Sequence, residues 1–196
     1  TLDEVGRFHR TMFVPSRMIV IAAGDATHDA LAAAVEGAFA GWRPLAEARQ
    51  IDRSKWPSPP VVRQRLAILH RPGAAQSELR IGHVGAARQT PDYHALVVLN
   101  IILGGQFVSR INMNLREDKG YTYGARTSFD FRLGPGPFVL NASVQSEVTV
   151  DAILEALDEL QAIRGRRPVT AAELQAGRAA LTRGYPRNFE SAEEIS

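Results

Sequence analysis

The chain has no cysteine and only two lysines, Lys55 and Lys119. The lack of cysteine excludes disulfides, thiolate zinc sites and cysteine nucleophiles, and it leaves the compartment open, because a reducing cytosol and an oxidising periplasm both accept such a chain. The 23 basic residues are nearly balanced by 21 acidic ones, for a formal net charge of +2. Arginines cluster near the middle of the chain, at Arg49, Arg53, Arg63, Arg65 and Arg71. Acidic residues are interleaved and aromatic stacking partners are missing, so a solvated surface is favoured over nucleic-acid binding.

Long apolar runs are also missing. The most apolar stretch, residues 95–103, is far shorter than the roughly 18 residues that predict a membrane span, so we expect no such span. The chain starts with Thr1 and has neither a start methionine nor a signal peptide, so we expect it to be a piece of a longer protein. Its 196 residues, 45% of them hydrophobic and 22% charged, predict a globular chain with a sizeable core.

The histidines do not form a helical zinc motif. H-E-x-x-H needs a glutamate directly after the first histidine, and H-x-x-E-H needs a second histidine four residues on. Neither condition is met by any of His9, His28, His70, His83 and His94. The sequence also lacks G-x-x-x-x-G-K-[ST] and G-x-S-x-G. We therefore expect no metal site in this chain.

The first part of the chain, residues 1–41, predicts a strand followed by a helix. The β-branched run at residues 17–23 favours a strand. Thr27 is a candidate cap for a helix from His28 to about Phe39. Residues 42–60 contain four prolines and mixed charges without an apolar period, which predicts a linker. Residues 61–196 then form the main expected domain.

In that domain we expect the order strand, strand, helix, helix, strand, strand, helix, helix. The expected strands are residues 65–70 and 77–84 and a hairpin of residues 121–133 and 138–145. The helix of residues 92–103 is apolar nearly all round and is expected to be buried. The next helix carries Phe107, Ile111 and Leu115 on one face and ends at Gly120.

The last two helices are expected to open at Thr149, with Ile153, Leu157 and Leu160 inward, and at the Thr170–Glu173 capping box. Pro186 should end or kink the second of them. Hairpins with paired helices between them predict an α+β fold, in which paired helices pack on a mostly antiparallel sheet.

Residues 100–125 hold the densest run of candidate chemistry. Arg116 lies near the end of a helix and Tyr123 early in the next strand, so the break at Gly120 can bring a guanidinium and a phenol to one rim. Both groups donate hydrogen bonds and suit substrate carbonyls. Two other interpretations stay open: the arginine could complement the helix dipole, and Tyr123 could pair with Tyr121 on one strand face.

The segment LREDKGYTYGA, with its R-x6-Y pair Arg116 and Tyr123, resembles the zinc-free domain of the pitrilysin (insulinase-like) family of inverted-zincin metallopeptidases. The segments ILGG, SRINMNLRE, RPGAAQSELRIG, TPDYHAL and VTAAEL resemble the same family. Residues 1–39 are similar to the closing strand and helix of the preceding domain, so the resemblance covers essentially the whole chain. Departures at Gln106, Val108 and Ile111 do not touch the Arg116 and Tyr123 pair.

The resemblance implies paired homologous domains, of the mitochondrial-processing-peptidase type, that close like a clamshell around a chamber. It implies that zinc belongs to a homologous partner half, on the same chain or a separate subunit. In this chain it implies that Arg116 binds the substrate backbone and that Tyr123 binds substrate and stabilises the oxyanion.

The chain would thus be the substrate-binding half of a bacterial zinc endopeptidase acting on peptides or unfolded polypeptides. Alone, it would be inactive and zinc-free. The alternative is a non-catalytic assembly subunit related to respiratory-complex core proteins. Retention of both Arg116 and Tyr123 favours the enzyme.

Overall fold

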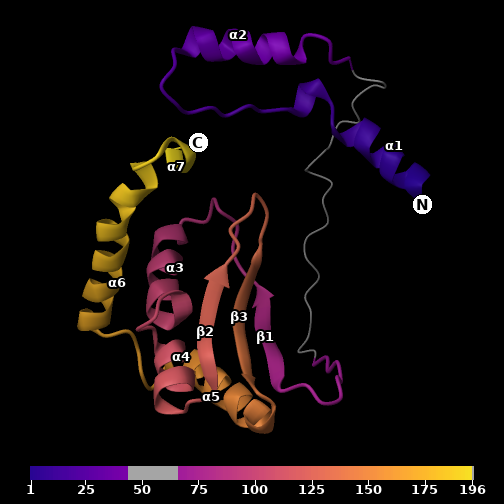
Figure 1. Cartoon of the computed structure of the whole chain (residues 1–196). Helices are drawn as coiled ribbons and strands as arrows, with labels where there is room; N and C mark the ends of the chain where they lie inside the picture. The colour runs from indigo at the N-terminus through magenta and orange to yellow at the C-terminus, as the bar shows by residue number, and fades with distance from the viewer. Residues whose placement is uncertain (44–65, 196) are drawn as a thin grey trace. The chain divides into compact units, whose positions relative to one another are not determined.

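The computed structural model describes residues 1–43 and 66–195, and it divides into two compact units (Figure 1). One unit comprises Thr1–Ser58 with Gly184–Ser196, and the other comprises Pro59–Arg183. The described part of the first unit is helical, with α1 (Leu2–Met12), α2 (His28–Phe39), α7 (Ala192–Ile195) and short 3-10 turns at Pro15–Arg17 and Tyr185–Phe189. The expected linker at 42–60 falls mostly outside the described residues, so the domain boundaries stay predictions.

The first unit confirms one sequence prediction and corrects another. Helix α2 begins after Thr27, whose hydroxyl accepts a hydrogen bond from Ala30 N at 3.3 Å. The strand predicted at residues 17–23 is wrong, because the chain there has no regular structure after the 3-10 turn. A strand needs a partner edge for its backbone groups, and the described part of this unit has no other strand. Helix α1, which begins at a capping box between Thr1 and Glu4, was not predicted.

The second unit is built on an antiparallel sheet of β1 (Gln76–Val84), β2 (Thr122–Phe129) and β3 (Pro137–Gln145), in the order β1-β3-β2. Every second residue of β3 is buried, from Phe138 to Val144. The predicted hairpin and the strand at 77–84 are confirmed. The strand at 65–70 is wrong in its described part, because residues 66–70 are unpaired and Leu66 and Ile68 are exposed.

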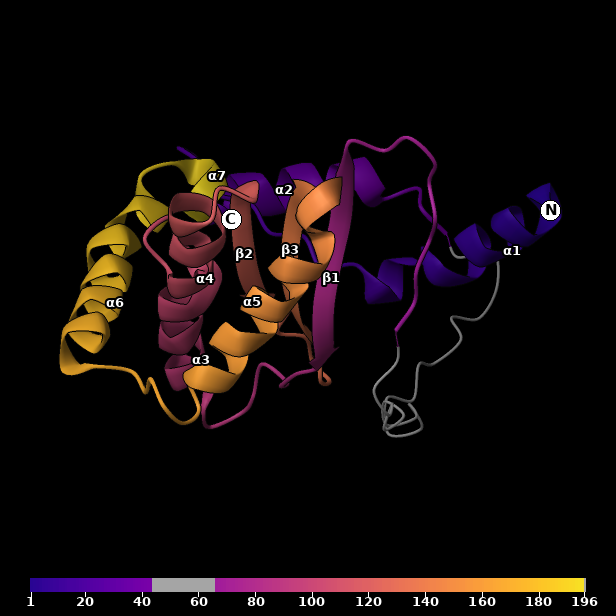
Figure 2. The same cartoon turned by 90° about the horizontal axis from the view of Figure 1, so that it is seen from below.

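Helices cover one face of this sheet (Figures 1 and 2). Helix α3 (Tyr93–Asn100) continues into a π-helical turn at Ile101–Gly105, and α4 (Arg110–Asn112) continues into another at Met113–Asp118. Helices α3 and α4 contact β2, while α5 (Thr149–Ala162) contacts β3. Helix α6 (Ala171–Gly184) completes the unit. This arrangement confirms the predicted α+β class, with paired helices on an antiparallel sheet.

The core lies between these helices and the sheet. Ile111 and Leu115 are fully buried, as predicted, and pack in one cluster with Leu140 and Val144 of β3. The third residue of the predicted face, Phe107, lies before α4 and is 54% exposed.

Two predictions about the burial of helices are wrong in part. Helix α3 has no fully buried residue, since burial begins only in its π-helical continuation, at Ile102. Helix α5 buries Ala152 and Ala156 fully, whereas Leu157 is exposed. Alanine on the buried face allows a helix backbone to approach the core closely, so the larger side chains lie at its margins; Ile153 and Leu160 are only partly buried.

The helical run Tyr93–Asp118 is 26 residues long and is apolar enough, by length and composition, to cross a membrane. A core helix of a soluble protein passes the same test. Leu103, Ile111 and Leu115 of this run belong to the core cluster. The absence of a membrane span stays a prediction.

Candidate functional site

Arg116 lies in the π-helical turn Met113–Asp118. Its guanidinium carbon is 4.5 Å from the centre of the Phe107 ring, a cation–π contact. Its Nε lies 3.3 Å from Oε1 of the adjacent Glu117, and its side chain is 37% exposed. Within the described part of the chain, no hydrogen bond engages its two terminal nitrogens. The guanidinium is therefore held in place while most of its donors stay available.

Gly120 reverses the chain directly after this turn. Its φ of +66° is in the left-handed region, which glycine adopts without strain. Gly120 N donates to Arg116 O at 3.1 Å, and Tyr121 N donates to Leu115 O at 2.9 Å. This tight reversal starts β2 at the end of the helix that carries Arg116, as the spacing of the two candidate residues predicted.

Tyr123 lies on a β-bulge. Thr122 pairs with Val144 and Ala125 with Ala142, so two residues of β2, Tyr123 and Gly124, oppose one residue of β3. The Thr122 hydroxyl holds the bulge, since it donates to Ser143 O at 2.6 Å and accepts from Gly124 N at 3.1 Å.

The bulge turns Tyr123 away from the helices. Val144 and Ala142 are buried on the helix-covered face, and the side chain between them in β3 faces the opposite side of the sheet. Tyr123 is accordingly 88% exposed, whereas Tyr121 packs against the core. The interpretation of Tyr121 and Tyr123 as a pair on one strand face is therefore wrong.

Asn112, which sequence reasoning missed, connects the two candidate residues. It is only 4% exposed. Its Nδ2 donates to Phe107 O at 2.7 Å, and its Oδ1 accepts from Ala125 N, directly after the bulge, at 3.0 Å. The segment whose ring contacts Arg116 is thus tied to the strand that presents Tyr123. The available signal was an asparagine beside Ile111 on the apolar face of a helix.

Arg116 and Tyr123 make no direct hydrogen bond with each other in the described structure. Both present donors near the start of β2, a planar fork from Arg116 and one hydroxyl from Tyr123. Such donors suit the carbonyl oxygens of an extended peptide. In the described residues, no group of three or more His, Cys, Asp or Glu side chains could hold a metal ion. The residues at hand therefore do not fit zinc.

A second polar region surrounds Arg110 and borders a recess of about 680 Å³. Arg110 donates to both carboxylate oxygens of Glu173, at 2.6 and 2.7 Å, and to the carbonyl oxygens of Arg167 and Pro168. The hydrogen bond from Arg110 is the main cause that lowers the pKa of Glu173 to about 2. Thr170 N also donates to Glu173, and Glu173 N donates to the Thr170 hydroxyl at 3.2 Å, which confirms the capping box. These groups satisfy one another and join α4 to α6.

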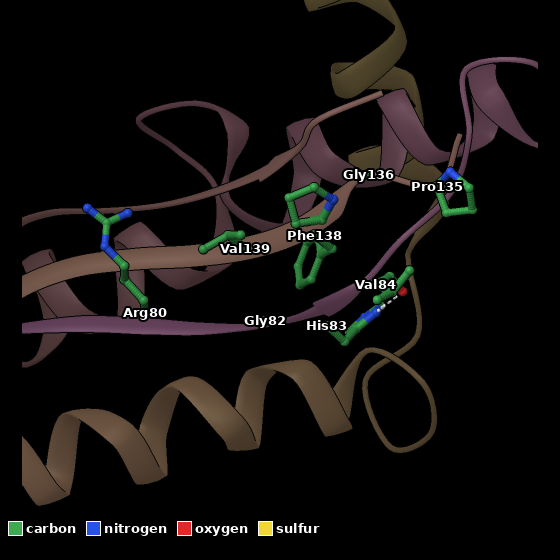
Figure 3. Close-up of a pocket in the computed structure, with 9 residues that line it drawn as sticks. Arg80, Gly82, His83, Val84, Pro135, Gly136, Phe138 and Val139 are labelled. Atoms are coloured by element: carbon green, nitrogen blue, oxygen red, sulfur yellow. Dashed lines mark hydrogen bonds between the residues drawn. The ribbon is translucent and has the colours of Figure 1, made fainter. Parts of the chain in front are cut away.

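A third feature is an apolar recess of about 390 Å³ between β1 and β3 (Figure 3). It is lined by Arg80, Gly82, His83, Val84 and residues 135–139. The His83 Nδ1 is 2.7 Å from Val84 O in its wall. Tyr123 and Arg116 are not among its lining residues, because the recess is at the opposite end of β3 from the bulge.

Residues 1–181 match the family model described as the peptidase M16 inactive domain. The chain is 29% identical over 195 residues to a zinc protease of Mycobacterium tuberculosis, covering 97% of this chain and 43% of that protein. It is 27% identical over 162 residues to a zinc protease of Streptomyces coelicolor, covering 82% of this chain and 35% of that protein. The chain therefore spans less than half the length of these curated relatives.

Solved structures agree with the family match. The peptidase M16 inactive domain from Pseudomonas fluorescens is 28% identical, with a TM-score of 0.57 over 62% of this chain and 29% of that one. A protease from Helicobacter pylori, 21% identical, shares the fold over 100% of this chain and 47% of its own, with a TM-score of 0.83. The resemblance inferred from the R-x6-Y pair is thereby confirmed: the chain belongs to the pitrilysin (peptidase M16) family of zinc proteases, as an inactive domain.

Proposed function

We propose that this chain is the substrate-binding, zinc-free half of a bacterial zinc endopeptidase, which closes with a homologous zinc-bearing half around peptides or unfolded polypeptides. The observation that carries the proposal is the presentation of Tyr123, an 88% exposed phenol on a β-bulge. An exposed tyrosine on a bulge held by Thr122 gains nothing evident for folding. Bulges next to active sites commonly re-aim a side chain.

In this proposal, each residue acts through its hydrogen-bond donors. The Tyr123 hydroxyl donates to the oxyanion that develops on the scissile carbonyl. The Arg116 fork donates to substrate backbone carbonyls while its contact with Phe107 fixes the guanidinium plane. Zinc in the partner half would activate the attacking water.

The test is Tyr123→Phe in the full-length peptidase, or in this chain combined with its zinc-bearing half. The change removes one hydroxyl from an exposed side chain, so folding should survive. Loss of a single oxyanion donor should lower kcat about 10²-fold, with a smaller change in KM. Tyr121→Phe is the matched control and should be nearly silent. Full kcat in a folded Tyr123→Phe protein would refute the assignment.

The alternative function is a non-catalytic assembly subunit. It is favoured by one specific likeness, because Complex III2 from Candida albicans shares the fold with a TM-score of 0.58 at 17% identity, over 88% of this chain and 41% of that one. A scaffold needs neither Arg116 nor Tyr123, so retention of both favours the peptidase. An H-x-x-E-H motif in the same reading frame or a neighbouring gene would support the enzyme, and its absence from both would support the scaffold.

A further inference from the structure

Three polar side chains form a row across the face of the sheet that is opposite to helices α3, α4 and α5. Asn141 of β3 pairs with Arg80 of β1 on one side and with Arg126 of β2 on the other. Directly opposed residues in neighbouring strands lie on the same face. The next pair along, Leu79 with Ala142, is buried under the helices, so the row faces the other way. Arg80 and Arg126 are both exposed.

Within the described structure, the hydrogen bonding of the row leaves most of its N–H donors free. Arg80 Nη1 donates to Asn141 Oδ1 at 2.8 Å. This bond uses one of the two lone pairs of the Asn141 side-chain oxygen, and among the described residues the Asn141 amide N–H groups have no hydrogen-bond partner. In the described structure, the Arg126 guanidinium has no ion pair or hydrogen bond. Arg80, Asn141 and Arg126 thus present a line of N–H groups that carries two positive charges.

We propose that this row binds a carboxylate of the peptide substrate, a glutamate or aspartate side chain near the scissile bond. Guanidinium forks pair with carboxylates through two parallel N–H···O bonds, and the Asn141 amide between them adds a neutral donor. The adjacent row carries one acidic side chain, Glu78, which accepts from the Ser143 hydroxyl at 2.6 Å, so the two positive charges of Arg80 and Arg126 still exceed the one negative charge beside them. The row therefore complements an incoming negative charge.

The inference rests on the proposed function, because the row adjoins Tyr123 on one face. The Tyr123 bulge opposes Ser143, and Asn141 is two residues further along β3, a distance of about 7 Å in a strand. The apolar recess follows in the same direction, and Arg80 belongs to both the row and the recess (Figure 3). An extended peptide with its scissile bond at Tyr123 would thus have its acidic residue within a few positions of the cut.

The experiment uses this chain combined with its zinc-bearing half, with zinc removed, so that binding is measured without cleavage. The probes are fluorescein-labelled, C-terminally amidated octapeptides of Ala, Ser and Leu, with one Glu or one Gln scanned along the peptide. Fluorescence anisotropy should show the best Glu peptide binding about ten-fold or more tightly than its Gln twin. Arg126→Gln should reduce that ratio to near one. Arg178→Gln, which neutralises an exposed arginine of α6, should leave it unchanged.

Other outcomes would overturn the proposal. Equal binding of Glu and Gln peptides at every position would do so, as would an equal loss of the ratio in the Arg126 and Arg178 variants. A Gln peptide with a free C-terminus that binds as tightly as the Glu peptide would identify the terminal carboxylate, rather than a side chain, as the ligand. Failure of the proposed function is separate, because it appears as an unchanged kcat in Tyr123→Phe, whereas the Glu-to-Gln ratio needs no catalysis.

Discussion

Two arginines six residues apart on one helical run, Arg110 and Arg116, have opposite surroundings. Arg110 is 13% exposed and is bonded to both oxygens of Glu173 and to two backbone carbonyls. Arg116 is 37% exposed, lies over an aromatic ring and, among the described residues, has one charged partner, the adjacent Glu117. The same residue type thus closes a structural network at one position and keeps its donors open at the other.

The comparison shows that two arginines on one helical run can serve different purposes, one the stability of the fold and the other the binding of a ligand. Four of the five N–H donors of Arg110 are used within the protein, so its main role is to support the fold. An arginine held by a ring contact keeps its orientation without using its hydrogen bonds. We therefore expect substitutions at Arg110 to change stability and those at Arg116 to change substrate binding.

The largest effect is expected for Arg110→Ala. It leaves Glu173 without its charged partner and removes the side-chain donor from two carbonyl oxygens. The free energy of unfolding should fall by about 2–4 kcal/mol, below the full cost for a buried pair because Glu173 is partly exposed. Urea denaturation measures this, and Arg116→Ala should cost less than about 1 kcal/mol. Equal costs at the two positions would break the comparison.

Next comes Arg116→Ala in the assembled peptidase. Charged hydrogen bonds are worth about 1.5–3 kcal/mol, so kcat/KM should fall about ten- to one-hundred-fold, with a raised KM. Arg116→Lys should rescue poorly, because a point charge cannot reproduce a planar fork. Steady-state kinetics on a peptide substrate tests both variants, with Arg178→Ala as control. Full activity in Arg116→Lys would show that only the charge matters.

Asn112→Asp tests the side chain that links the Phe107 segment, which contacts Arg116, to the strand that carries Tyr123. An ionised aspartate can still accept from Ala125 N, but it cannot donate to Phe107 O. The unmet carbonyl of Phe107 should cost about 1–3 kcal/mol of stability, and kcat should fall because the Phe107 segment loses its link to the strand that presents Tyr123. The kcat effect should largely vanish in a Tyr123→Phe background, which a purely structural role would not produce. Asn188→Asp, at an exposed position, is the control.

The smallest effect is a pH dependence at Glu173. Its pKa is lowered from 4.5 to about 2, mainly by the hydrogen bond from Arg110. Because the folded pKa lies below the unfolded one, the stabilisation is complete above pH 4.5 and is lost as pH falls toward 2. The difference in unfolding free energy between wild type and Glu173→Gln should therefore shrink across that window. A difference that stays constant down to pH 2 would contradict the pairing.

Much of the fold could be predicted from local patterns, and the errors share one cause. Capping at Thr27 and Thr170, the break at Gly120 and the alternation of β3 are encoded within a few residues of each feature. The strand predictions at 17–23 and 65–70 are wrong because a β-branched run indicates only a propensity for extended backbone. Pairing requires an edge supplied by distant residues, and the described structure provides none for these segments.

The residues of the candidate site also fall into those that were predicted from local sequence and those that were missed. Arg116 and Tyr123 were predicted because their spacing is part of a family signature, although their functional roles stay proposals. Asn112 and Phe107 were missed because their roles depend on hydrogen bonds and ring contacts that exist only after helix and sheet have packed. Neither residue type is rare enough to attract notice in a sequence. Arg126 likewise comes to lie beside Asn141 only through the register of the strands, which the sequence does not reveal.

The bulge at Tyr123 and Gly124 also acts as a phase shift. Residues before it and after it alternate about the sheet with opposite parity in sequence, so Thr122 and Ala125, three positions apart, share a face. Deleting one of the two bulge residues would restore a regular ladder with a single residue opposite Ser143, and would remove the backbone conformation that the Thr122 hydroxyl holds. Insertions and deletions between Gly120 and Ala125 should therefore be purged from functional sequences far more strictly than those in the hairpin loop around Gly134. The length of this short segment, as much as its chemistry, is what evolution has to preserve.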